Sequence, residues 1–160
     1  MPPNPLPRRI AVRLADLRRH YEALALVLER TSHEEFQSAA RASDPEGLAR
    51  SVYPVERGSE ILGNYVAELV ELGLRQLGIE PGDRTASLRL LQQEGVIGSE
   101  RRRRLHGALR ARNALQHEYP DVRADMTYDA ATGLLAELPG FLRDYARWLR
   151  RLGYGDDEQI

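Results

Sequence analysis

The chain contains neither cysteine nor lysine. Without cysteine there can be no disulfide, no zinc–thiolate site and no catalytic thiol. Such a composition suits a reducing compartment, and we expect a cytoplasmic protein. The longest apolar run covers residues 23–28, which is far short of the roughly 20 residues that a membrane-spanning helix needs. We therefore expect no membrane segment.

Signals for metal or nucleotide chemistry are also missing. The four histidines lack the His-Glu-x-x-His spacing of zinc enzymes. The turn between Gly78 and Gly82 contains no lysine, so it does not match a phosphate-binding loop. The sequence therefore predicts no metal site and no cofactor.

Helical periodicity dominates what is present. Hydrophobic residues make up 42% and charged residues 29% of the 160 residues, which is typical of a globular domain. No stretch alternates as a half-buried strand does. The sequence predicts an all-α protein, an up-and-down bundle of four main helices plus short helices. It further predicts a single domain over residues 8–152, a disordered lead over 1–7 and a polar tail over 153–160.

Apolar spacing and capping residues define the expected helices. The segments expected to be helical are 8–30, 33–40, 45–77, 85–93, 99–119 and 128–152, with a loop over 121–127. Asp44 and Pro45 are expected to open the third segment, and Pro54 can kink it. Pro120 is expected to end the fifth segment. Pro139 disfavours an unbroken last helix.

One short segment carries a chemical signature. It combines Arg112, Asn113, His117 and Tyr119 within eight residues. A histidine can transfer protons near neutral pH, an arginine can hold the charge of a phosphate, and a tyrosine ring can stack on a base. The asparagine can orient either of the first two. Together these side chains predict RNA cleavage that needs no metal ion.

The helical position of Arg112 leaves an alternative open. At 100° per residue, it falls on the apolar stripe that contains Leu105 and Leu109. An arginine on such a stripe must meet an anion, a carboxylate or solvent. The alternative to a phosphate is an ion pair with an acid of the long helix, such as Glu56 or Glu60.

Positive charge gathers around the same segment. Residues 101–123 include seven arginines against only Glu118 and Asp121, although the whole chain has a net charge of −1. The arginines expected to attract RNA are Arg101, Arg102, Arg103, Arg104 and Arg110, with binding that weakens as salt rises. The alternative is a solvated helix start, because basic residues at a helix N-terminus oppose its dipole and gain nothing locally.

These residues resemble the signature of the HEPN superfamily and, more narrowly, the HepT-like toxins. The segments that carry the resemblance are 112–119, Val52–Arg57 with Glu60–Leu62, Leu90–Ile97 and Tyr119–Val122. They span roughly residues 48–150. The chain departs from the family pattern at Arg110-Ala111, where the family usually has Gly-Leu, and at Gln116, where it usually has a small apolar residue.

The resemblance implies a HEPN-like fold and a metal-independent endoribonuclease toxin that cleaves RNA, such as tRNA or mRNA, as a homodimer. His117 from each of two chains would supply the base and the acid, and Arg112 would clamp the scissile phosphate. Asn113 would position one of them. Glu56 and Arg57 of the long helix are expected either to pair locally or to support Arg112.

The resemblance also implies a partner. In such pairs a minimal nucleotidyltransferase acts as the antitoxin and attaches AMP to the tyrosine that follows the histidine, here Tyr119. Two other interpretations stay open from the sequence. The chain can be a non-catalytic HEPN-type adaptor that binds RNA or a nucleotide for a nucleotidyltransferase, or a purely structural helical protein.

Overall fold

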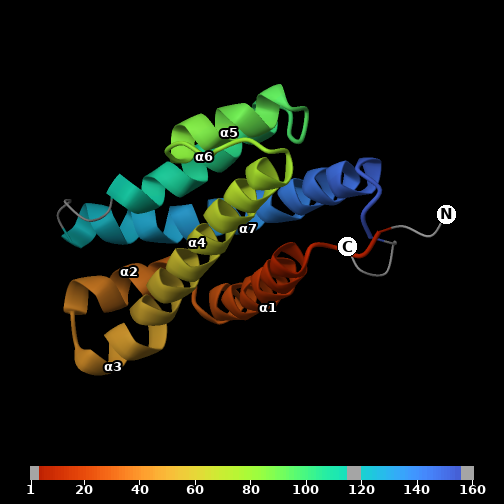
Figure 1. The fold of residues 1–160 in the computed structure, drawn as a ribbon. Coiled ribbons are helices and arrows are strands. Elements are labelled where there is room, and N and C mark those ends of the chain that lie inside the picture. Colours follow the sequence, from red (N-terminus) through yellow and green to blue (C-terminus); the bar gives the residue numbers. More distant parts are fainter. Residues whose placement is uncertain (1–3, 115–119, 156–160) are drawn as a thin grey trace. The chain divides into compact units, whose positions relative to one another are not determined.

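The structure is a computed structural model that describes the backbone of residues 4–114 and 120–155, and the side chains of residues 4–110 and 125–155. These residues form helices and no strand (Figure 1), so the prediction of an all-α protein is confirmed. The elements are α1 (Arg8–Arg30), α2 (His33–Ala42), α3 (Pro45–Gly47), the π-helix η1 (Leu48–Val52), α4 (Tyr53–Gln76), α5 (Arg84–Gln93), α6 (Ser99–Ala114) and α7 (Pro120–Arg151).

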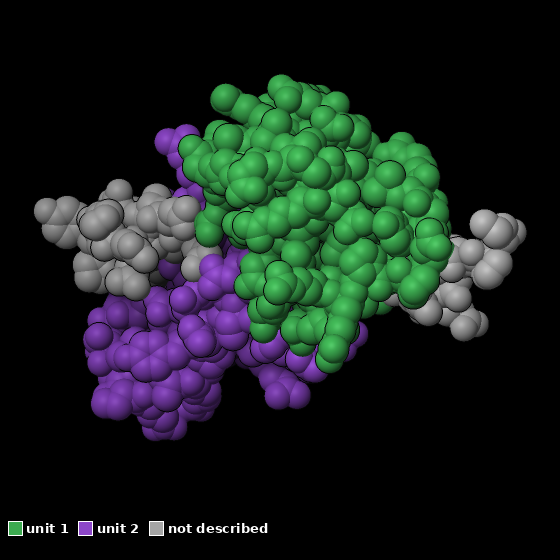
Figure 2. Space-filling model, viewed as in Figure 1, with its two compact units in different colours: residues 1–18, 65–106, 137–160 green, residues 19–64, 107–136 purple. Residues whose placement is uncertain are grey.

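The chain divides into two compact units, which Figure 2 distinguishes by colour. Unit 1 comprises residues 1–18, 65–106 and 137–160, and unit 2 comprises residues 19–64 and 107–136. The division falls inside α1, α4, α6 and α7, so each of these helices contributes one end to each unit. Both units therefore combine segments that are far apart in sequence.

The core of unit 1 contains a cluster of aromatic rings on α7. The ring centroid of the fully buried Tyr145 lies 5.7 Å from that of Phe141 and 5.2 Å from that of Trp148. Its hydroxyl donates a hydrogen bond of 2.9 Å to the Leu69 carbonyl of α4. Gly73 permits this approach, because a Cβ there would lie 3.1 Å from the hydroxyl. Burial raises the pKa of Tyr145 well above its ordinary value.

We expect Tyr145→Phe to lower the free energy of unfolding at pH 7 by about 1 kcal/mol, the typical net contribution of one hydrogen bond. The difference from wild type should shrink above pH 10. There the unfolded wild-type chain ionises this tyrosine, whereas the folded chain, with its raised pKa, does not, and the stability of the wild type falls. Urea unfolding of both proteins on either side of pH 10 measures this, and a gap that widens would contradict it.

Side-chain caps begin the short helices of unit 2. The Ser32 hydroxyl accepts from the N–H of Glu35, whose carboxylate accepts from the N–H of Ser32, and this reciprocal pair opens α2. Asp44 caps α3, which has Pro45 at its first position. Between them Ser43 ends α2 in the left-handed conformation, with a φ of 54°. The predicted caps are thus confirmed.

A π-helix interrupts the long helix that was expected over residues 45–77. In η1 the N–H of Tyr53 donates to the carbonyl of Leu48, five residues back. Pro54 comes next, and in a regular α-helix its ring would press on the carbonyl of Arg50. The wider π turn relieves this crowding. The irregularity expected at Pro54 therefore takes the form of a π-helix.

The start of α7 corrects the sequence-based expectation. Residues 121–127, expected to be a loop, belong to this helix, which begins at Pro120. This part of α7 is held by α2, because Asp125 lies 3.3 Å from the His33 ring nitrogen and Tyr128 stacks on the same ring. Such contacts leave no local pattern in the sequence.

Two further features complete the fold. The last helix passes through Pro139 without interruption, so the single helix expected over residues 128–152 is confirmed despite this proline. In unit 1, Asn4 and Tyr154 form an isolated bridge, in which the Asn4 N–H donates to the Gly153 carbonyl and the Gly155 N–H to the Asn4 carbonyl. Within the ranges 4–114 and 120–155, no helix is long and apolar enough to cross a membrane.

Candidate functional site

The segment with the chemical signature lies at the end of α6. The backbone of Arg112 and Asn113 belongs to α6, whereas His117 and Tyr119 lie outside the described residues. Position 112 follows Leu105 by seven residues, so helical register places it on the stripe of the buried Leu105 and Leu109. The predicted extension of this helix to residue 119 likewise falls outside the described residues.

Arg101, at the start of α6, is held by two carboxylates of α7. Its Nη1 lies 2.7 Å from Oε2 of Glu137, and its Nε lies 3.2 Å from Oδ2 of Asp144. Gly140 makes room for this guanidinium, which a Cβ at that position would overlap. Partial burial disfavours the charge of Arg101, but the hydrogen bonds and charges of the two acids outweigh it and raise its pKa. Arg101 therefore joins α6 to α7 within unit 1.

Two of its neighbours are also engaged. The Nε of Arg102 donates to Oε1 of Gln92 in α5 at 2.5 Å. Arg104 pairs with Glu100 one turn earlier and lies 3.8 Å from Glu137. Three of the four consecutive arginines thus have protein partners within unit 1.

The remaining arginines of the predicted RNA-binding set are different. Arg103 and Arg110 are exposed, and neither has a partner among the residues that the structure describes. Arg103 belongs to unit 1 and Arg110 to unit 2. Among the described residues their charges are unpaired, whereas that of Arg101 is neutralised, and RNA binding by the whole set stays a prediction.

We expect Arg101→Gln to lower the free energy of unfolding by about 1–3 kcal/mol. The change leaves Glu137, whose side chain is only 13% exposed, without its closest cation. The matched control Arg103→Gln removes the same charge from the next position and should change stability by less than about 0.5 kcal/mol. Urea unfolding measures both, and equal stabilities would contradict the structural role of Arg101.

The two supporting residues on α4 lie in unit 2. Arg57 is exposed, and its Nη1 lies 3.1 Å from Oε2 of Glu60, one turn along the same helix. Glu56 is half-buried and has a partner of its own. The pairing of Arg57 is therefore local, and any support for Arg112 from these residues stays a prediction.

A polar cluster beside the start of α7 had no signal in the sequence. The imidazole of His33 lies between an acid and a ring, 3.3 Å from Asp125 and stacked at 4.8 Å on Tyr128. The Tyr128 hydroxyl donates to the Thr31 carbonyl at 2.9 Å, and Gln37 donates to Asp125. All five residues already find partners in unit 2, so the cluster is explained as an anchor of α7 on α2.

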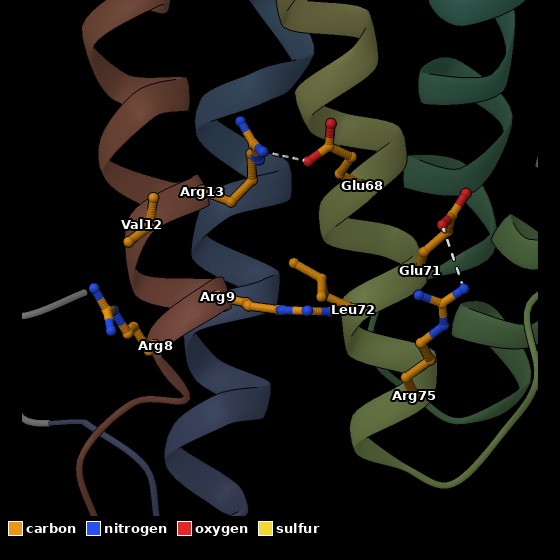
Figure 3. Close-up of a pocket in the computed structure, with 8 residues that line it drawn as sticks. All are labelled: Arg8, Arg9, Val12, Arg13, Glu68, Glu71, Leu72 and Arg75. Atoms are coloured by element: carbon orange, nitrogen blue, oxygen red, sulfur yellow. Dashed lines mark ion pairs between the residues drawn. The ribbon is translucent and has the colours of Figure 1, made fainter.

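Unit 1 contains a pocket of about 570 Å³ between the first turns of α1 and the second half of α4 (Figure 3). Its lining residues are Arg8, Arg9, Val12, Arg13, Glu68, Glu71, Leu72 and Arg75. The sequence-based prediction missed this pocket. The one available signal was a pair of arginines at a helix start with no acid in the first turn.

Metal ligands do not cluster in the described part of the chain. No group of three histidine, aspartate or glutamate side chains there could hold a metal ion.

Comparison with known proteins gives one match. The model of a family described as "Ribonuclease HepT-like" matches residues 17–145, which include α6, residues 115–119 and most of α7. Neither the curated proteins nor the solved structures give a match.

Proposed function

Because the chain belongs to the HepT-like ribonuclease family, we propose that it is a metal-independent endoribonuclease toxin that uses Arg112, Asn113 and His117. The observation that carries this proposal is the family match, which extends over most of the chain and spans residues 112–119. The ordered segments of the sequence that resemble the family, 52–57, 90–97 and 112–122, support it as well.

The chemistry follows from the residue types. A base removes the proton of the ribose 2′-hydroxyl, its oxygen attacks the adjacent phosphorus, and the P–O5′ bond breaks while an acid protonates the leaving 5′-oxygen. The products are a 2′,3′-cyclic phosphate and a 5′-hydroxyl. The guanidinium of Arg112 would stabilise the charge that develops on the phosphate oxygens.

A dimer would make this scheme complete. One imidazole cannot be base and acid in the same step, so His117 from each of two chains would fill the two roles. Asn113 would orient His117 or Arg112. A homodimer in solution, measured by light scattering, is a requirement of this arrangement.

The proposal also includes a partner. We propose that a minimal nucleotidyltransferase silences the ribonuclease by transferring AMP to Tyr119, two residues from His117. The added phosphate would place negative charge near Arg112, and the adenosine would occupy space needed by RNA. Both effects would stop cleavage without unfolding the chain.

The decisive experiment is incubation of the purified protein with tRNA and with total RNA in EDTA. We expect cleavage, with fragments that end in a 2′,3′-cyclic phosphate. Intact-mass analysis of the same preparation distinguishes an unmodified chain from one that carries AMP. If an unmodified chain of confirmed mass does not cleave RNA, the proposed ribonuclease activity is excluded. The alternative function, a non-catalytic RNA-binding adaptor, is then favoured.

A further inference from the structure

The pocket of unit 1 carries an excess of positive charge. Four arginines and two glutamates line it. The Nη2 of Arg13 lies 2.5 Å from Glu68, and that of Arg75 lies 4.0 Å from Glu71, as the dashed lines of Figure 3 mark. Both glutamates of the lining are therefore paired with an arginine. Two cations therefore remain without a countercharge in the lining.

Those two cations are Arg8 and Arg9. Both are exposed, and within the described ranges no partner is found for either side chain. Figure 3 shows the side chain of Arg9 reaching from α1 toward Leu72 of α4. Arg13, by contrast, is fixed by Glu68 and lies 4.3 Å above the ring of Tyr65, so it forms part of the wall.

The local structure of α1 does not explain why arginines stand at these positions. They are the first two residues of the helix, and its first turn contains no acid. Cations at a helix N-terminus oppose the helix dipole and cost a few tenths of a kcal/mol each. A ligand with negative charge would offset this cost.

The same pocket offers apolar surface. Val12 of α1 is 51% exposed, and Leu72 of α4 also lines the pocket. A ligand that fits both features carries at least two negative charges beside a flat or aliphatic body. Successive nucleotides of a single RNA strand meet this description, since each has one phosphate charge and one base.

The arginine run on α6 is less suited to this task. Arg101, Arg102 and Arg104 are already hydrogen-bonded or ion-paired to the protein. A phosphate would have to displace those partners. Among the described residues, Arg8 and Arg9 have no partner for a phosphate to displace.

We propose that this pocket is an RNA-binding subsite in which Arg8 and Arg9 contact two successive phosphates of a single strand, while Val12 and Leu72 pack against a base or ribose. The proposal rests on the proposed function, because the strand held there is the ribonuclease substrate. The subsite binds RNA through its backbone, so it is tolerant of sequence.

The test is binding of a fluorescein-labelled single strand whose 2′-hydroxyls are all methylated. Such a strand cannot be cleaved, because the attacking hydroxyl is blocked. We expect Arg8→Gln/Arg9→Gln in the full chain to weaken binding by roughly five- to twentyfold at low salt, given up to about fivefold for each exposed ionic contact. The plot of log affinity against log salt should become shallower by about 1.4, or about 0.7 for each lost phosphate contact.

A matched control removes equal charge elsewhere on unit 1. Arg89 and Arg143 are exposed, lie outside the pocket and have no partner among the residues described. Arg89→Gln/Arg143→Gln should leave the salt slope close to that of the wild type. Thermal unfolding should show that Arg8→Gln/Arg9→Gln is at least as stable as the wild type, because it removes cations from a helix start.

Equal affinities and salt slopes for the two double variants would overturn the proposal. If an acidic peptide then bound the wild type but not Arg8→Gln/Arg9→Gln, the pocket would be a site for a protein partner. The readout is independent of catalysis. If Arg8→Gln/Arg9→Gln weakens RNA binding but the wild type does not cleave RNA, the subsite stands and the proposed ribonuclease activity is rejected. If the wild type cleaves RNA but the double variant binds RNA as the wild type does, the activity stands and the subsite is rejected.

Discussion

Replacement of His117 by alanine is expected to lower the rate of RNA cleavage by about 10⁴-fold or more. Proton transfer by a positioned side chain contributes roughly 10²- to 10⁴-fold, and in a homodimer the substitution removes the proposed base and the proposed acid together. The measurement is the single-turnover rate on a tRNA substrate in EDTA. Single turnover isolates the chemical step from product release.

The control is another histidine of the chain. His106 lies on α6, eleven residues earlier, and His106→Ala should cleave at close to the wild-type rate. His117→Ala should still bind the methylated single strand with wild-type affinity, because the imidazole acts on the proton and not on strand capture. Cleavage that persists in His117→Ala would exclude this histidine as the proton-transfer group. Loss of both cleavage and binding would instead indicate a damaged fold or interface.

Co-expression with a minimal nucleotidyltransferase is expected to convert the wild-type chain completely to a form that carries AMP and does not cleave RNA. In that reaction the Tyr119 hydroxyl oxygen attacks the α-phosphorus of ATP, pyrophosphate leaves, and the phenol proton passes to a base of the transferase. Tyr119→Phe lacks the attacking oxygen. It should stay unmodified and active, so that the partner no longer silences it.

Intact mass and cleavage, measured on the same samples, decide this prediction. Tyr53, at the start of α4, provides the control. With an exposed fraction of 55%, it is the most exposed of the tyrosines that the structure describes. Tyr53→Phe should be modified and silenced as the wild type is. Modification that survives in Tyr119→Phe would place the AMP elsewhere, and silencing without any added mass would indicate inhibition by binding alone.

The helices were predictable where their signals are local. The first helix was expected over residues 8–30 and is observed over Arg8–Arg30, because apolar spacing continues through its whole length. Ser32 and Asp44 identified two helix starts, since a capping side chain bonds to backbone only three residues away. Periodicity and caps both act within one or two turns, which is why one sequence reveals them.

The errors arose where the stabilising contacts are distant in sequence. Residues 121–127 have weak apolar periodicity, and their helix is tied to α2 through Asp125 and Tyr128. The arginines at 101–104 form a cationic patch when only neighbouring residues are counted. In the folded chain Glu137 and Asp144, about 40 positions away, neutralise much of that charge. Counting arginines along residues 101–104 therefore overestimates the positive charge that this surface presents to a ligand.

The proposed site could be predicted from the sequence only as a set of residue types. Arg112, Asn113 and His117 together suit phosphate chemistry, and their roles stay a prediction because their side chains lie outside the described residues. The pocket at Arg8 and Arg9 could not be found in this way. Its walls come from two helix segments more than fifty residues apart in the sequence. Arg8 and Arg9 lack a countercharge in the lining because Glu68 and Glu71 pair with Arg13 and Arg75, and these pairs form only in the folded chain.

The π-helix η1 has a consequence for chain length during evolution. A π turn accommodates one residue more than an α turn does, so loss of a single residue within Leu48–Val52, in a relative that has no proline at the position of Pro54, would restore regular α geometry and leave α4 facing the same way. The same deletion inside α4 would rotate every later side chain by about 100° and remove Leu62, Val66 and Leu69 from the core. Members of the family should therefore differ in length at this turn more often than along the helix that follows.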